Sequence, residues 1–320
     1  MFIKGVLQEI IKASPILGGP YIIDAYGMKG GPALPFMEIE GNALTYNREV
    51  DASAMATWKA PLEAWTSHDE PTFAQVSTTL KIIGAQAIID NYIQQTRSNK
   101  QDQTAAVIAG AAKAIAFGYE DQFIYGTGAT VYPAGVHVLC NTVTPVGTYQ
   151  RLTVKAAIGN TDTPLTTMLI HQLIDLVRPV PDILLMNRFV KNLLSQYAAT
   201  KTSPIQYLPQ QFGQSVTLFD GIPIAVSDFI TQTELSDATG WYSAKTGGLT
   251  SSIFAIKFGE RNLCGIQNGG VQKQLIGEAE GFDAKIWRLK WYCGLAEFAT
   301  VSVACLSNIG STGTAIPIVA

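Results

Sequence analysis

The feature that most constrains the fold is a long alanine-rich pattern in NKQDQTAAVIAGAAKAIAFGYEDQFIYG, residues 99–126. One row of apolar residues runs through Val107, Ala111 and Ile115, and a second row with the same four-residue spacing lies beside it. The pattern predicts a single helix of about 24 residues, roughly 36 Å long, with a broad apolar face. Its alanines allow a sheet or helix to approach closely. We expect Gly126 to end the helix as a left-handed cap.

Before this helix, two strand-like segments at residues 43–50 and 72–83 predict a long hairpin. The connection of about twenty residues is too long for a tight turn, so the hairpin has an elaborated tip. Trp58 and Trp65 lie in that tip, together with Lys59. Two exposed tryptophans are a liability on an isolated chain, so we expect something outside the chain to cover them.

The rest of the chain mixes helix and strand signals, which predicts an α+β or α/β body. A helix with Thr163 as its cap and Pro164 at its first position precedes the buried strand DILLMN. The other expected elements are a short helix at 86–96, a helix at 188–199, a strand-turn-strand unit at 216–228, a half-buried strand through Trp287, Leu289 and Trp291, and a strand at 299–306.

The acid pair Glu120–Asp121 and the following Gly126-Thr127-Gly128 suggest a reactive site at first sight. Neighbouring residues on a helix point about 100° apart, so the two acids do not form a carboxylate pair. We interpret them as solvated or interface acids on one side of the helix. The glycine motif lacks its third glycine, because Val131 takes that position, and it follows a helix where a phosphate loop follows a strand.

No other pattern indicates catalysis or a cofactor. The three histidines, His68, His137 and His171, are scattered and form no metal-binding motif. Glu38 and Glu40, like Glu278 and Glu280, are best interpreted as solvated acids, and no nucleophile motif accompanies Lys245-Thr246-Gly247. We therefore expect no enzyme, no cofactor and no metal site.

The composition favours a subunit with extensive contacts. Charged residues make up only 15% of the chain, below the roughly 25% typical of soluble domains. The net charge of −3 gives no basic field for holding nucleic acid. The four cysteines form no spaced pairs, so we expect buried thiols. Residues 1–12 have the spacing of an amphipathic arm, and no segment is long and apolar enough to span a membrane.

The order of these features resembles the major capsid proteins of tailed bacteriophages, which have the Hong Kong 97-type fold. EDQFIYGTG is similar to that family's end-of-spine pattern of an acid pair, an aromatic residue and a glycine turn. PDILLMN with the following helix, and GIPIAVSD with Ile224 in place of valine, are similar to elements of the axial A-domain. The final two strands, in GFDAKIWRLKWYCGLAEFATVSVACL, resemble the return to the peripheral P-domain.

The resemblance implies a domain map. Residues 1–36 would be the N-arm, 37–83 the extended E-loop, 84–135 the P-domain with its spine helix, 136–273 the A-domain, and 274–320 the P-domain return strands and C-terminal tail. Trp58, Lys59 and Trp65 would then be assembly-interface residues of the E-loop, and Glu120 and Asp121 would mark the end of the spine helix.

The resemblance also implies a function and partners. The chain would be the main subunit of an icosahedral viral capsid, assembled in the host cytoplasm as hexamers and pentamers. The shell would enclose double-stranded DNA without sequence-specific binding and work with a portal and a decoration protein. Because the sequence starts at the arm, we expect a separate scaffolding protein. Some family members crosslink an E-loop lysine to a P-domain asparagine, and Lys59 and Asn308 are the candidates here.

Two alternatives stay open at this point. An encapsulin-like cellular nanocompartment shares the fold but encloses an enzyme cargo, and neighbouring genes would distinguish it from a virus. A cytoplasmic α/β enzyme would instead be a monomer or a small oligomer with a pocket for a ligand.

Overall fold

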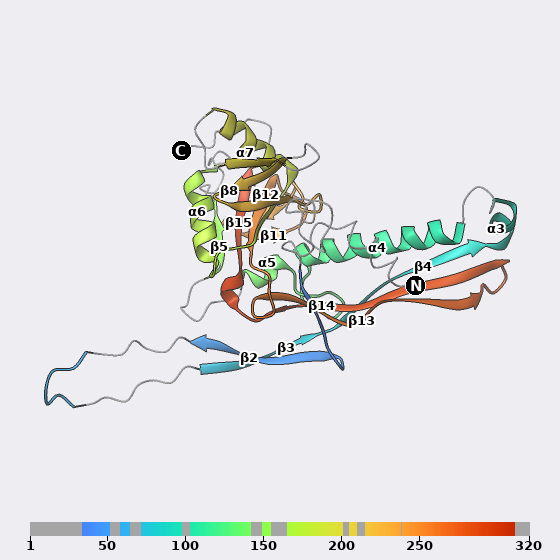
Figure 1. Ribbon diagram of the computed structural model, residues 1–320, viewed down its shortest axis with the longest axis horizontal. Helices are drawn as coiled ribbons and strands as arrows, with labels where there is room; N and C mark the ends of the chain where they lie inside the picture. Colours follow the sequence, from blue (N-terminus) through green and yellow to red (C-terminus); the bar gives the residue numbers. More distant parts are fainter. Residues whose placement is uncertain are drawn as a thin grey trace.

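The computed structural model describes residues 34–51, 58–64, 72–97, 103–141, 149–154, 165–200, 205–209, 215–237 and 239–310. These residues form three parts, which we call the body, the spine and the hairpin (Figure 1). The spine and the hairpin extend from the body in opposite directions (Figure 1). The expected N-terminal amphipathic arm lies outside the described residues.

The helices are α3 (Asn91–Arg97), α4 (Gln103–Tyr125), α5 (Val136–Leu139), α6 (Thr167–Leu176) and α7 (Arg188–Thr200), with a 3₁₀ turn at Thr300–Ser302. The first strands are β1 (Phe36–Glu38), β2 (Ala43–Asp51), β3 (Thr72–Thr79), β4 (Lys81–Asp90), β5 (Arg151–Thr153), β6 (Ile183–Met186), β7 (Ile205–Pro209) and β8 (Ser215–Phe219). The remaining strands are β9 (Ile222–Val226), β10 (Leu235–Ser236), β11 (Tyr242–Ala244), β12 (Thr250–Ile256), β13 (Leu263–Glu278), β14 (Ala284–Glu297) and β15 (Val303–Gly310).

The spine consists of α4 and the four-stranded sheet β1-β13-β14-β4, along which the helix runs (Figure 1). The predicted long helix is confirmed, since α4 has 23 residues. Its apolar face is buried at Ile108, Ala112 and Ile115. Small residues permit close approach to the sheet: a Cβ added to Gly118 would lie 3.0 Å from Ile83 Cδ1.

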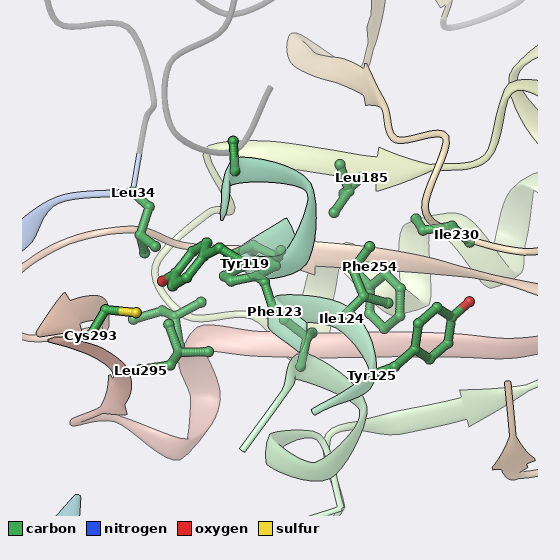
Figure 2. Close-up of a cluster of buried hydrophobic side chains, with 14 of the residues drawn as sticks. Leu34, Tyr119, Phe123, Ile124, Tyr125, Leu185, Ile230, Phe254, Cys293 and Leu295 are labelled. Carbon is green, nitrogen blue, oxygen red and sulfur yellow. The ribbon is translucent and has the colours of Figure 1, made fainter. Parts of the chain in front are cut away.

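Further along α4, the aromatic side chains join the spine to the body. Tyr119 packs between Phe36 and Trp291, with ring centroids 5.9 and 5.0 Å away. Figure 2 shows Tyr119 and Phe123 in one cluster with Cys293 of β14. The same cluster continues through Ile124 to Phe254 of the body (Figure 2). One apolar core therefore runs across the junction and fixes the helix on both parts.

The expected helix at residues 86–96 is wrong in its first half. Strand β4 continues to Asp90, and only Asn91–Arg97 is helical. Along β4 the burial alternates, with Ala87 and Ile89 buried and Gln86 and Ile88 exposed. This two-residue period is that of a strand with one covered face. Pairing with ten residues of β14 overrides the local helical preference.

The body is built on a seven-stranded mixed sheet in the order β5-β15-β12-β6-β9-β8-β7. Both of its faces are covered, which explains why the predicted strand β6 is buried at every position. Ile183 and Leu185 face the core shared with α4, whereas Leu184 and Met186 face α6 and α7. The predicted α7 and the strand-turn-strand unit β8–β9 are also confirmed.

Two boundaries in the body differ from the expectation. Helix α6 begins at Thr167, and its cap is Thr166, whose hydroxyl accepts a hydrogen bond from the Leu169 amide at 3.2 Å. Thr163 and Pro164 lie outside the described residues. The last strand begins at Val303, because residues 300–302 form a 3₁₀ turn. The prediction from Ala299 was therefore four residues early at that end.

The predicted hairpin is a separate two-stranded sheet formed by β2 and β3. The second strand expected at residues 72–83 was too long, because residues 81–83 belong to β4 of the spine sheet. It projects away from the body on the side opposite to the spine (Figure 1). The amide of Leu80 donates to the Asn42 carbonyl at 2.9 Å and closes its base. A two-stranded sheet cannot bury both of its faces by itself.

The expected left-handed cap at Gly126 is wrong, because the positive φ belongs to Gly128 at 71°. Glycine is required at position 126 because the backbone there leaves no room for a side chain. A Cβ there would lie 2.3 Å from the Pro133 carbonyl oxygen and 2.4 Å from that of Gln122. The Gly135 amide donates to the Gly126 carbonyl at 2.8 Å, so the chain turns back closely against the helix end.

Candidate assembly surfaces and their junctions

The hairpin has one half-buried face and one exposed face. Tyr46 pairs with Val76 across the two strands, and both side chains are half-buried. The neighbouring positions Asn47 and Gln75, also a pair, are exposed. The Tyr46 hydroxyl donates to a backbone carbonyl at the end of β14 at 2.7 Å, which anchors the foot of the hairpin to the spine sheet.

The described part of the hairpin tip, residues 58–64, presents apolar side chains on an ordered turn. Trp58 and Leu62 are fully exposed. Glu63 accepts hydrogen bonds from the Ala60 amide at 2.9 Å and from Lys59 Nζ at 3.4 Å. The Leu62 backbone has φ of 70°, a conformation that costs free energy in a non-glycine residue.

The three residues predicted to lie at an assembly interface, Trp58, Lys59 and Trp65, differ in their surroundings. Trp58 is available for a contact with another molecule. Lys59 is ion-paired with Glu63, and only 15% of its side chain is exposed. Trp65 lies outside the described residues. The crosslinking candidate Asn308 donates from its Nδ2 to the Val154 carbonyl at 3.0 Å.

Glu120 and Asp121 were interpreted as solvated or interface acids on one side of the helix, and the solvated alternative is wrong for Glu120. Glu120 is only 1% exposed, and its carboxylate accepts a hydrogen bond of 2.7 Å from Ser227 Oγ. The physical reason is the orientation of α4: Glu120 lies on the side that meets the body, about 100° from Asp121. Asp121 lies near the rim and pairs with Lys245. The two acids thus contact different segments of the body.

A buried carboxylate that the sequence did not reveal contacts the last residue of α4. Glu234 is 1% exposed and accepts hydrogen bonds from Tyr125 Oη at 2.6 Å and Ser252 Oγ at 2.5 Å. His137 Nε2 lies 3.4 Å from the same carboxylate. Burial and the neighbouring Glu234 raise the pKa of Tyr125, so the phenol keeps its proton and remains a donor.

Aromatic rings enclose this polar cluster. The His137 ring stacks on Tyr242 with centroids 3.8 Å apart and contacts Phe254 edge-on at 4.8 Å. Burial raises the pKa of Tyr242 to about 12. Because Glu234 and His137 are 97 positions apart, only the tertiary fold brings them together. The cluster can hold the end of α4 firmly on the body. Its hydroxyl donors, Tyr125 and Ser252, are already used by the Glu234 carboxylate of the same chain.

The outer face of the spine sheet, opposite α4, is both apolar and basic. We define this outer spine face by Ile82, Gln86, Ile88, Arg288 and Lys290, which the register of β4 and β14 places together. Ile82 is 70% exposed and Ile88 58%. Arg288 Nη2 donates to Gln86 Oε1 across the strands at 3.3 Å. Such a face suits a partner with apolar groups and negative charge.

Across the described ranges, no group of three or more histidine, cysteine, aspartate or glutamate side chains could hold a metal ion. Within the same ranges, no helix has the length and apolar character needed to cross a bilayer. All four cysteines are buried free thiols, as expected.

Comparison with known proteins finds similar solved structures but no match in sequence. No family model matches the chain, and no curated protein does. The holo-SrpI encapsulin complex from Synechococcus elongatus PCC 7942 is similar over 87% of this chain and 86% of its own, with a TM-score of 0.62 and 16% identity. The capsid of a native GTA particle is similar over 87% and 88%, with a TM-score of 0.59 and 10% identity.

A third similar structure is the capsid of cyanophage P-SCSP1u. It has a TM-score of 0.53 and 11% identity, and 85% of each chain is covered. The chain has the Hong Kong 97-type fold. The α+β class and the fold expected from the resemblance are thereby confirmed. The similarity to the first two structures spans 87% of the chain.

Within this fold, the residues predicted from the sequence lie in different places. The expected domain bounds remain a prediction, and the bound between residues 273 and 274 falls inside the continuous strand β13. Trp58 lies at the hairpin tip, whereas Glu120 and Asp121 lie at the junction of spine and body. The structure does not bring the two sets of residues together within one chain.

Proposed function

We propose that this chain is the major structural subunit of a closed protein shell, and specifically of an icosahedral viral capsid. In this proposal, hexamers and pentamers of the chain enclose double-stranded DNA. The role is structural, and we assign the chain no reaction. The observation that carries the proposal is the fold, which is similar to capsid chains over 85% or more of this chain.

The surfaces support self-association. The hairpin exposes Trp58 and Leu62 on a turn that is already ordered, which lowers the entropy cost of binding. Residues 40–79 contain six acidic and two basic side chains, whereas the outer spine face carries Arg288 and Lys290. The hairpin of one copy and the outer spine face of another are therefore complementary in charge.

A cellular compartment is the second candidate function. The encapsulin complex has a higher TM-score and a higher identity to this chain than the two capsids described above. A compartment would enclose protein cargo in place of DNA. A scaffolding protein, a portal and a decoration protein belong to the capsid proposal alone, as does assembly of a virion in the host cytoplasm.

The test is to express the full chain, alone and with the products of its neighbouring genes, and to image the product by negative-stain electron microscopy. Closed shells, or rings of five and six subunits, would support the shell. Nuclease-resistant double-stranded DNA inside such shells would support the capsid, and a co-purifying enzyme would support the compartment. A monodisperse particle of 34.4 kDa under all conditions would contradict both.

A further inference from the structure

The foot of the hairpin covers a buried carboxylate. Glu297 is the last residue of β14 and is 2% exposed. Arg48 of strand β2 places Nη1 at 3.2 Å from its Oε2. Tyr46 of the same strand donates to the Glu297 carbonyl at 2.7 Å, and its ring packs 4.6 Å from Phe298. The attachment of the hairpin therefore centres on one residue.

The charge of Glu297 is poorly compensated. Its Oε2 has a single guanidinium partner, and that partner's side chain is itself 20% exposed. Its Oε1 has no hydrogen-bond partner among the described residues. A buried ionised carboxylate needs several donors to offset the loss of water, whereas a protonated one needs fewer. The enclosed site therefore favours the neutral acid.

The titratable groups around Glu297 do not shift its equilibrium over to the ionised form. Among the described residues, three titratable groups interact with Glu297: Arg48 and Tyr46 on β2, and Cys140 at the end of α5. Burial raises the pKa of both Tyr46 and Cys140, so these two are neutral near pH 7 and contribute no positive charge. Burial raises the pKa of Glu297 to about 8, although Arg48 acts in the opposite direction. Desolvation thus outweighs the ion pair.

The carboxylate and the hairpin are coupled because the covering groups belong to β2. If β2 moves away from the foot, water reaches Glu297 and its pKa falls toward the ordinary value of 4.5. Of two conformations, a rise in pH favours the one in which the carboxyl group has the lower pKa. We propose that Glu297 is a proton-operated latch: the hairpin foot is closed while this carboxyl is protonated and opens when it ionises. The latch is a property of one chain, so it does not depend on the proposed shell.

Pulsed electron-electron resonance on the full chain tests the latch. Spin labels are attached at Gln75→Cys on the exposed face of β3 and at Arg261→Cys on the turn before β13, both exposed positions. The native cysteines are all buried, so labelling under native conditions is selective. Dilution with unlabelled chain removes distances between subunits. We expect one distance population at about pH 5 and a second, displaced population that becomes dominant by about pH 9.

The matched variants make the result specific. In Glu297→Gln, which keeps the shape but cannot ionise, the single population should persist at every pH. In Glu260→Gln, which removes an exposed acid, the pH response should match that of the unmutated chain. A distance distribution in the unmutated chain that does not change with pH would overturn the latch whether or not any variant folds. The same pH response in Glu297→Gln would also overturn it.

Discussion

The hydroxyl of Tyr125, the last residue of α4, lies 2.6 Å from Oε1 of Glu234 in the body. The Tyr125 hydroxyl oxygen in turn accepts a hydrogen bond from the Thr231 amide at 2.9 Å. A phenol can donate once and still accept, so one side chain satisfies a buried carboxylate and a backbone amide together. This contact, with Glu120–Ser227 one turn earlier, fixes the long helix to the body.

Tyr125→Phe should therefore destabilise the chain. The change removes one of the donors to the buried Glu234 carboxylate and the acceptor of the Thr231 amide, and the loss of such hydrogen bonds costs about 1–3 kcal/mol. Urea unfolding followed by tryptophan fluorescence measures the loss. The matched control is Tyr132→Phe, at a half-exposed tyrosine, which should change stability by less than about 0.5 kcal/mol. Equal stability of the two variants would contradict the role of Tyr125.

Elements with a regular local pattern could be predicted from the sequence. Helix α4 follows from its repeated four-residue spacing, and β6 from a short apolar run. Strand β13 was not predicted, although it is the longest strand described, with 16 residues. Its register shifts between Asn268 and Val271, where Gly269 and Gly270 have positive φ. Such bulges interrupt the alternation that identifies a strand.

The junction could not be predicted for a different reason. The sequence identifies Glu120 as one of two adjacent acids, but which of them faces the body depends on how α4 rotates against the sheets. Glu234 lies in a segment with no regular pattern, and its donors come from three other elements. Long-range contacts of this kind leave no local spacing in the sequence. The fold itself was recognisable because the order of its elements is a global property.

Two glycines, one within the long helix and one directly after it, should respond in opposite directions to alanine. A Cβ at Gly110, within α4, would meet nothing within 4 Å, so Gly110→Ala should stabilise the chain by about 0.5–1 kcal/mol. A Cβ at Gly126 would overlap two carbonyl oxygens, so Gly126→Ala should destabilise it by more than about 2 kcal/mol. Thermal unfolding of both variants measures the difference. Similar effects of the two changes would contradict the close turn at the helix end.

Truncation of the hairpin tip should impair assembly and leave the subunit intact. Trp58→Ala removes an exposed side chain that contacts no core, so the unfolding free energy should change by less than about 0.5 kcal/mol. If the tip anchors a neighbouring copy, loss of a tryptophan anchor weakens each contact by about 2 kcal/mol or more. Sedimentation measures the assembled fraction. Val180→Ala, at an exposed apolar residue of the body, is the control, and equal assembly of both variants would contradict the tip contact.

The stability of the chain should depend on pH through Glu297. Its pKa is raised from 4.5 to about 8 in the folded chain, so the folded state binds the extra proton. The stabilising contribution of this group is fully present below pH 4.5 and is lost as the pH rises to about 8. One proton changes the unfolding free energy by at most about 1.4 kcal/mol per pH unit. Glu297→Gln should therefore become progressively more stable than the unmutated chain across this interval, and the difference should level off above it. Urea unfolding of both chains at each pH measures the difference. A constant difference would show that the folded chain holds Glu297 with an ordinary pKa, because only a shift between the folded and unfolded states makes the difference vary with pH.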